Sequence, residues 1–162
     1  MSTLHWAGLM GLAMIAGAVV PFQSAINVNL GRGLGHPLWA TLASLLVSVV
    51  VLLPIIVAMR LPLPSLAFIS KAPPWMWAGG AFGVIFISLA LVLLPKLGAA
   101  GFMALVLAGQ VVASLLLDHY GWFGLVERQV TLPKMFGVAL LMAGVVLIQF
   151  SDAAQKAMTA TS

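Results

Sequence analysis

Residues 38–59 read LWATLASLLVSVVVLLPIIVAM, a run that contains no charged side chain. An α-helix needs about 20 predominantly apolar residues to cross the hydrocarbon core of a bilayer. This run has the required length, and it offers no charged face to water. The stretch therefore predicts a transmembrane helix and sets the fold class of the chain.

Four more apolar runs extend this pattern outward, at residues 4–30, 75–94, 99–117 and 134–150. The last run is the shortest and lies at the low end of the spanning range. Five spans occupy nearly the whole sequence, which predicts an all-α polytopic membrane protein with one transmembrane domain over residues 1–150. The small and polar residues 151–162 are expected to form a disordered tail.

The composition excludes several classes of function. Of the 162 residues, 63% are hydrophobic and 6% are charged, whereas a soluble domain has about 25% charged residues. The seven Lys and Arg residues are scattered singly and not clustered on one face, so we expect no nucleic-acid partner. Cysteine is absent, and the histidines and acids lack metal-ligand spacing, paired carboxylates or a nucleophile motif. We expect no metal, no cofactor and no enzymatic activity.

Tryptophan marks the ends of the predicted spans. Indole is stable at the headgroup level of a membrane, and all five tryptophans fall at such ends: Trp6, Trp39, Trp75, Trp77 and Trp122. The residues before Ala16 include no Lys or Arg, so we expect no cleaved signal peptide at the small residues that follow.

The charge balance across the membrane is nearly even. With five spans, the amino terminus and the loops after the second and fourth spans share one side. That side holds Arg60, Lys71, Arg128 and Lys134, and the other side holds Arg32, Lys96 and Lys156. Orientation follows the excess of cations on the cytoplasmic side. Either the chain inserts weakly with its amino terminus inside, or it inserts both ways round and forms antiparallel pairs.

Polar side chains inside the fourth span need partners, because lipid offers none. Gln110 lies close to the centre of residues 99–117, where it serves either as an inter-helix hydrogen bond or as a substrate contact. Ser114 and Asp118 follow at steps of four and continue a polar stripe. Asp118 is either a solvated interfacial acid or a proton- or ligand-binding group. Its candidate cations are His119, Arg60, Lys71, Arg128 and Lys134.

The first span carries a second polar group. Pro21 removes a backbone hydrogen bond and predicts a kink, and Gln23 and Asn27 follow on one face. An interrupted membrane helix with polar residues beside the break is typical of transporter sites. Alternatively, the hydrocarbon span ends near Phe22, and both amides are interfacial.

Hydroxyl and small residues predict helix packing. Thr41, Ser44 and Ser48 share a face of residues 38–59, where hydroxyls commonly bond to their own helix. Small residues recur four apart in the third and fourth spans, at Gly79, Gly83, Ala100, Ala104 and Ala108. Such spacing lets membrane helices approach closely.

Several motifs occur in the order of a known family. They are QSAINVNLG at 23–31, WAGGAFG at 77–83, PKLGA at 95–99 and GQVVASLLLDHYG at 109–121, followed by Gly137 and Gly144. Together, from residue 17 to residue 150, they resemble the five-helix, EamA-like YdcZ branch of the drug/metabolite transporter superfamily. In that family the segment from Ser44 to Ser48 is expected to carry an aromatic residue and a glycine, which leaves the packing of this helix open.

The resemblance implies a five-helix half-unit of an inverted-repeat fold in the bacterial cytoplasmic (inner) membrane. Larger relatives look like two such units fused in opposite orientations. We therefore predict a secondary transporter of a small polar or amphipathic solute that works by alternating access. Its partner would be a second copy, in an antiparallel homodimer, or an oppositely oriented paralogue. The related small multidrug-resistance exporters use a membrane-embedded Glu in the first helix, which this chain lacks, so their proton-coupled export of cations is not supported.

The predicted substrate contacts are Gln23, Asn27, Gln110 and Ser114, with Asp118 as a gating or proton-binding candidate. Neutral amides suit hydrogen bonding to a solute better than they suit a bare cation. The alternative function is a non-transporting assembly or partner subunit in which every polar residue serves helix packing.

Overall fold

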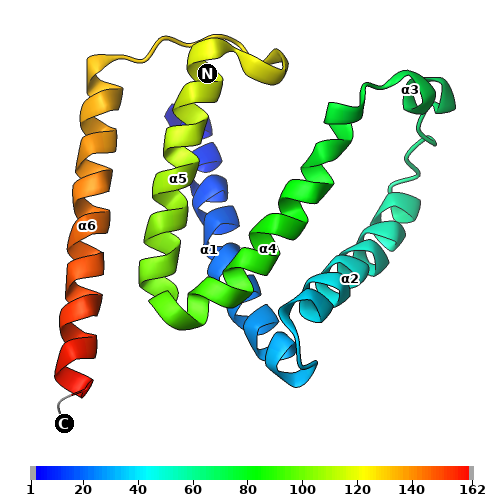
Figure 1. Cartoon of the computed structure of the whole chain (residues 1–162). Helices are drawn as coiled ribbons and strands as arrows, with labels where there is room; N and C mark the ends of the chain where they lie inside the picture. The colour runs from blue at the N-terminus through cyan, green and yellow to red at the C-terminus, as the bar shows by residue number, and fades with distance from the viewer. Residues whose placement is uncertain (1–2, 161–162) are drawn as a thin grey trace. The chain divides into compact units, whose positions relative to one another are not determined.

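The computed structural model describes residues 3–160, without the side chains of residues 3, 4, 6, 156, 157, 159 and 160. Five long helices dominate it (Figure 1): α1 Thr3–Gly33, α2 Pro37–Ala58, α4 Ala78–Leu97, α5 Ala99–Tyr120 and α6 Leu132–Ala160. Short helices lie between them at α3 Leu66–Lys71, η1 Pro74–Trp77 and η2 Trp122–Gly124. Five helical segments of the described part are long and apolar enough to cross a membrane, which confirms the predicted all-α, five-span fold.

Local chemistry explains where the helices begin and end. His36 precedes α2, and its Nδ1 accepts a hydrogen bond from the backbone N–H of Leu38 at 3.2 Å. Gly98 separates α4 from α5 with a φ of +78°, and Gly121 ends α5 in the left-handed conformation with a φ of +59°. Both conformations favour glycine, because it has no Cβ to clash with the backbone.

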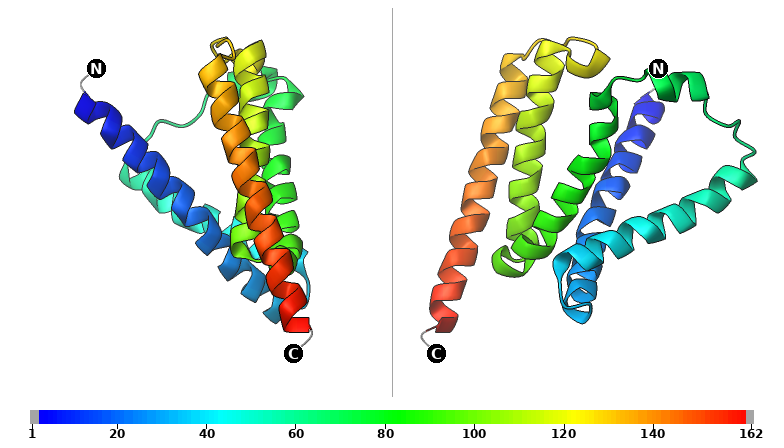
Figure 2. Two further views of the ribbon diagram at one scale, coloured as in Figure 1. Left: turned by 90° about the vertical axis from the view of Figure 1, so that its left-hand side faces the viewer. Right: turned by 45° about the vertical axis from the view of Figure 1, so that its right-hand side comes forward.

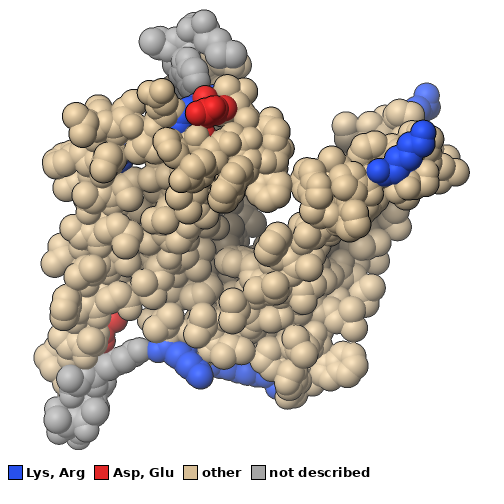
Figure 3. Space-filling model, turned by 45° about the horizontal axis from the view of Figure 1, so that its top comes forward, with Lys and Arg blue, Asp and Glu red and all other residues tan. Residues whose placement is uncertain are grey.

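The helix ends carry the groups that suit a membrane–water interface. Trp39 lies near the start of α2, Trp75 and Trp77 lie in η1, and Trp122 lies in η2, all with exposed side chains. The side chains of Trp6 and Lys156 fall outside the described ones. Figure 3 shows an uncharged surface along the middle of the helices on the face drawn, with the visible charged side chains near the helix ends. This distribution fits helices that cross a hydrocarbon layer.

The chain forms two compact units, Met1–Pro95 and Lys96–Ser162. In the first, α1, α2 and α4 meet around Gly31. A Cβ added to Gly31 would lie 2.9 Å from Leu91 Cδ2 and 3.5 Å from Ala40 Cβ, so glycine lets the helices meet here without displacing the Leu91 side chain. Ala40 and Leu91 are buried, and Thr41 Oγ1 lies 3.2 Å from Ser88 Oγ, which joins α2 to α4. Away from this junction α2 diverges from α1 (Figures 1 and 2).

The second unit is a hairpin in which α5 and α6 lie side by side (Figure 1). Phe102 and Val145 are buried. At the end of the hairpin away from the loop, Gln149 Nε2 donates a hydrogen bond to the Gly101 carbonyl oxygen at 2.9 Å. A Cβ added to Gly101 would lie 2.6 Å from Asp152 Oδ2, so the Asp152 carboxylate occupies the space that the missing side chain leaves.

Helix α6 continues to Ala160, through residues for which the sequence predicts a disordered tail. The segment 153–158 reads AAQKAM, and all of these residue types are strong helix formers. Polar composition alone does not distinguish a disordered segment from a helix that extends beyond the membrane. Thr161 and Ser162 lie outside the described residues.

Candidate functional site

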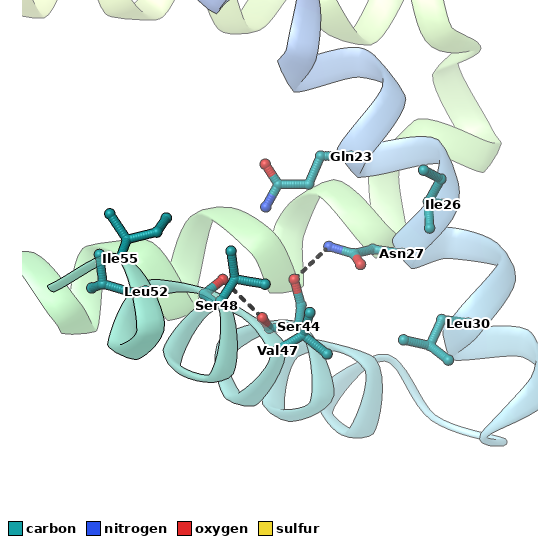
Figure 4. A pocket seen from close by; sticks show the side chains of 10 residues that line it. Gln23, Ile26, Asn27, Leu30, Ser44, Val47, Ser48, Leu52 and Ile55 are labelled. Atoms are coloured by element: carbon teal, nitrogen blue, oxygen red, sulfur yellow. Dashed lines mark hydrogen bonds between the residues drawn. The ribbon is translucent and has the colours of Figure 1, made fainter. Parts of the chain in front are cut away.

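The helices α1 and α2 enclose a groove of about 620 Å³, which we call the α1–α2 groove. It opens because α2 diverges from α1 beyond their common junction (Figure 2). Its lining comes from Gln23, Ile26, Asn27 and Leu30 of α1 and from Ser44, Val47, Ser48, Val51, Leu52 and Ile55 of α2. The structure thus brings the two predicted amides of the first span together in one recess (Figure 4).

The two amides differ in how well their hydrogen bonds are satisfied. Asn27 is buried, and its Nδ2 donates to Ser44 Oγ at 3.1 Å. Gln23 is exposed, and among residues 3–160 it has no hydrogen-bond partner. Figure 4 shows its amide extending from α1 toward α2, above Asn27. One amide therefore holds the helices together, and the other leaves donors and an acceptor open to the groove.

The depth of these amides follows from α2. Its 22 residues span about 33 Å, close to the thickness of the hydrocarbon core. Ser44 lies about 5 Å from the midpoint of α2, and Asn27 bonds to it at that depth. Gln23 lies one turn of α1 further from the α1–α2 junction than Asn27.

A second, smaller recess lies on the other side of the same amides. It has a volume of about 200 Å³ and is lined by Val20, Gln23, Ser24 and Asn27 of α1 and by Gly83, Phe86, Ile87, Ala90 and Leu91 of α4. Gln23 and Asn27 line both recesses, so their face of α1 lies between α2 and α4. A solute can therefore reach Gln23 from either of the two recesses.

The hydroxyl stripe of α2 has two roles. Thr41 Oγ1 donates to the Pro37 carbonyl at 3.2 Å, and Ser48 Oγ donates to the Ser44 carbonyl at 2.9 Å, as expected for hydroxyls in a helix. Ser44 also accepts from Asn27 and, with Ser48, lines the groove. Ser44 and Ser48 are not among the substrate contacts that the sequence predicts. Their spacing places them on one face of α2, but spacing alone does not identify the helix that this face contacts.

The predicted polar stripe of α5 is divided in the structure. Ser114 and Asp118 line a groove of about 360 Å³ between α5 and α6, which we call the hairpin groove. Gln110 lies at the middle of α5, is exposed, and stands outside the lining of that groove. Among the described residues it has no hydrogen-bond partner. Its amide is thus open at a depth where lipid cannot satisfy it.

Asp118 pairs with one of its five candidate cations. Lys134 Nζ lies 3.8 Å from Asp118 Oδ2, with the two side chains 40% and 38% exposed. The backbone carbonyl of Asp118 accepts a hydrogen bond from the N–H of Arg128 at 2.7 Å, which folds the loop back on α5. A pair this exposed contributes about 0–1 kcal/mol, so it separates readily.

The match to a known family reaches all five long helices. Residues 8–147 match the model of a family described as "Putative inner membrane exporter, YdcZ". The chain belongs to the YdcZ family. No curated protein and no solved structure matches it.

Membership in the YdcZ family confirms the resemblance carried by the four motifs, and with the five spans it makes the chain a multi-pass inner-membrane protein. The family description names an inner-membrane exporter, which is a class of transporter rather than of enzyme. The matched residues cover the α1–α2 groove and the hairpin groove, so both belong to the part of the chain that the family shares.

Proposed function

We propose that this YdcZ-family chain exports a small, uncharged polar or amphipathic solute that binds in the α1–α2 groove. The observation that carries the proposal is the amide of Gln23. It lies near the middle of the membrane span, has no partner among the described residues and extends into a groove of about 620 Å³. A polar group at this depth is costly unless it bonds to something, and a solute that enters the groove supplies that partner.

The lining of the groove supports an uncharged solute with an apolar part. None of its ten side chains is charged, and six of them are aliphatic. A charged ligand would lose its hydration on entering the groove and would find no opposite charge there. Such a transfer is strongly unfavourable at low dielectric. The Gln23 amide both donates and accepts hydrogen bonds, which matches amide, hydroxyl and carbonyl groups on a solute.

The structure of the groove favours a helix-packing role for Asn27 but not for Gln23. Asn27 is buried and bonded to Ser44, and an inter-helix amide bond in a membrane contributes about 1 kcal/mol. We therefore assign Asn27 to the wall of the groove, where it holds Ser44 in place. Gln23 is the side chain that contacts the solute.

We further propose that two chains act together as an antiparallel homodimer by alternating access. The odd number of spans and the near-even cation count support it, since either orientation is then accessible. In such a pair the two Gln110 amides share one depth and can satisfy each other or the solute, and the two Asp118 side chains lie at opposite faces. Ser114 and Asp118 of one chain then lie toward one opening of the transport path, and those of the other chain lie toward the opposite opening.

A ligand series tests the solute class. Purified protein is heated with N-alkyl amides of increasing chain length, and alkylammonium and alkylcarboxylate ions of the same lengths serve as charged controls. We expect the neutral amides to raise the unfolding temperature and the ions to leave it unchanged. Binding of the alkylammonium series in preference to the amides would contradict an uncharged groove.

Flux into proteoliposomes then tests the site with the best ligand of that series. We expect Gln23→Leu to lower the initial rate roughly tenfold or more, the effect of losing one hydrogen bond in a low-dielectric site. Asn29→Leu is the matched control, because Asn29 lies on the same helix but bonds to its own Ala25 carbonyl and does not line the groove. Unchanged flux in Gln23→Leu would contradict the assignment.

Reporter fusions at the carboxyl end test the dimer. A fluorescent reporter is active only in the cytoplasm and alkaline phosphatase only outside it, so an antiparallel homodimer gives signal from both fusions. Signal from one fusion alone would exclude it and leave a parallel pair or an oppositely oriented paralogue.

A further inference from the structure

The hairpin groove has a chemistry that goes beyond the place of Ser114 and Asp118 at the mouths of the proposed transport path. One end carries the Asp118–Lys134 pair with the Ser114 hydroxyl one turn away, and the rest is lined by Val111, Leu115, Gly137, Val138 and Leu141. It thus joins two opposite charges to an apolar channel. A ligand that fills it needs a head with both signs of charge and an apolar chain.

The charged end lies at the headgroup level. Asp118 is in the last turn of α5, and Lys134 is in the first turn of α6. Just beyond Asp118, the rings of Tyr120 and Trp122 stack with centroids 5.1 Å apart, and such aromatic groups collect at the membrane–water interface. From Asp118 to Val111 the groove runs about 10 Å along α5, toward the middle of the span.

The helix ends reinforce the two charges. The carboxyl end of α5 is the negative pole of its dipole and carries Asp118, so both attract a cation. The amino end of α6 is the positive pole and carries Lys134, so both attract an anion. Lys134 lies 3.8 Å from Asp118, longer than a charge-assisted hydrogen bond, and both side chains stay accessible. The pair can therefore open to admit an ammonium group and a phosphate between its members.

We propose that the hairpin groove binds a phospholipid whose headgroup carries a primary ammonium, as in phosphatidylethanolamine. The ammonium donates hydrogen bonds to Asp118, the phosphate accepts from Lys134, and an acyl chain lies along Leu115, Val138 and Leu141. Charge complementarity selects this occupant. An anionic lipid faces the carboxylate without a cation to offer, and a quaternary ammonium has no N–H to donate.

Native mass spectrometry of the full chain in detergent micelles tests the proposal. Phosphatidylethanolamine, phosphatidylcholine and phosphatidylglycerol with identical acyl chains are titrated, and the dissociation constant of the first bound lipid is measured. We expect phosphatidylethanolamine to bind roughly tenfold more tightly than the other two, the factor for a charge-assisted hydrogen bond near the surface. Equal affinities for the three lipids would overturn the proposal.

Two variants distinguish lipid binding in the groove from attraction of the lipid by general surface charge. Asp118→Asn should lower the affinity for phosphatidylethanolamine to that for phosphatidylcholine. Glu127→Gln removes the same charge from the adjoining loop without touching the groove and should keep the preference. The same loss in both variants would overturn the site. If Asp118→Asn does not fold, as judged by circular dichroism, Lys134→Gln is compared with Lys71→Gln on α3, and only the former should weaken phosphatidylethanolamine binding.

A soluble headgroup distinguishes the lipid from a free zwitterion. O-phosphoethanolamine carries the same ammonium and phosphate but no acyl chain. We expect it to compete with phosphatidylethanolamine at least tenfold more weakly than the intact lipid, because it leaves the apolar lining uncovered. Competition as strong as that of the lipid would overturn the lipid assignment in favour of a soluble ligand.

Discussion

Replacement of Gly101 by alanine tests how α5 and α6 are held together. The added Cβ would lie 2.6 Å from Asp152 Oδ2 and 3.2 Å from Gln149 Nε2, and the first distance is shorter than a real Cβ contact. Both side chains belong to α6, so the helix or its side chains must withdraw. The hydrogen bond of 2.9 Å from Gln149 Nε2 to the Gly101 carbonyl is then lengthened or lost.

The expected magnitude follows from that hydrogen bond. Inter-helix hydrogen bonds in membranes contribute on average about 0.6 kcal/mol and at most about 1.7 kcal/mol. The Asp152 carboxylate is the end of a flexible side chain and can turn aside at little cost, so we expect Gly101→Ala to be about 1 kcal/mol less stable than a matched glycine variant. Gly109→Ala is that control, because it lies in the same helix and its Cβ would meet no atom within 4 Å. The comparison cancels the intrinsic helix preference of alanine over glycine.

Equilibrium unfolding in mixed micelles with increasing sodium dodecyl sulfate measures this difference. Gln149→Leu should destabilise the wild-type background but have little effect in the Gly101→Ala background, because the shared hydrogen bond is already gone. If Gly101→Ala proves as stable as Gly109→Ala, or if Gln149→Leu costs the same in both backgrounds, the proposed contact does not stabilise the hairpin.

Three further substitutions test the first unit and the midplane amide. Gly31→Ala should destabilise the fold by about 1 kcal/mol, because its Cβ would lie 2.9 Å from Leu91 Cδ2, whereas Gly17→Ala meets nothing and should be neutral or stabilising in the same unfolding assay. Asn27→Leu should cost about 1 kcal/mol by removing the bond to its serine partner on α2, which a double-mutant cycle with that serine would detect as a coupling energy. Gln110→Leu should leave the stability of one chain equal or higher, since its amide has no partner among the described residues, but should lower flux in proteoliposomes; undiminished flux would remove Gln110 from the site.

The number and type of the main helices follow from hydropathy, because each transmembrane helix needs about 20 consecutive, mostly apolar residues. The predicted span 38–59 differs from α2 Pro37–Ala58 by one residue at each end. Hydropathy does not detect the six-residue helix α3, which is too short for a spanning window. It also does not detect the end of α6, where helical preference rather than apolar character continues the helix.

The hydrogen-bond and ion-pair partners in the candidate site are harder to predict from the sequence than the helices are. The spacing of Gln23 and Asn27 places them on one face, but the choice of Ser44 as a partner depends on how α1 and α2 cross. Lys134 was one of five candidate cations for Asp118, and the hairpin geometry selects it. Steps of four residues rotate by about 40° around a helix, so Gln110 turns away from the groove that Asp118 lines.

The two hydroxyls between α2 and α4 differ in their other partners. Thr41 Oγ1 lies 3.2 Å from both the Pro37 carbonyl oxygen and Ser88 Oγ, and either hydroxyl can donate in the contact between them. When Thr41 donates to Pro37, Ser88 donates to Thr41. Loss of the serine hydroxyl then leaves Thr41 with an acceptor on its own helix, whereas loss of the threonine hydroxyl removes the acceptor that α2 offers to Ser88. Evolutionary drift at this contact should therefore tolerate alanine at position 88 before it tolerates valine at position 41.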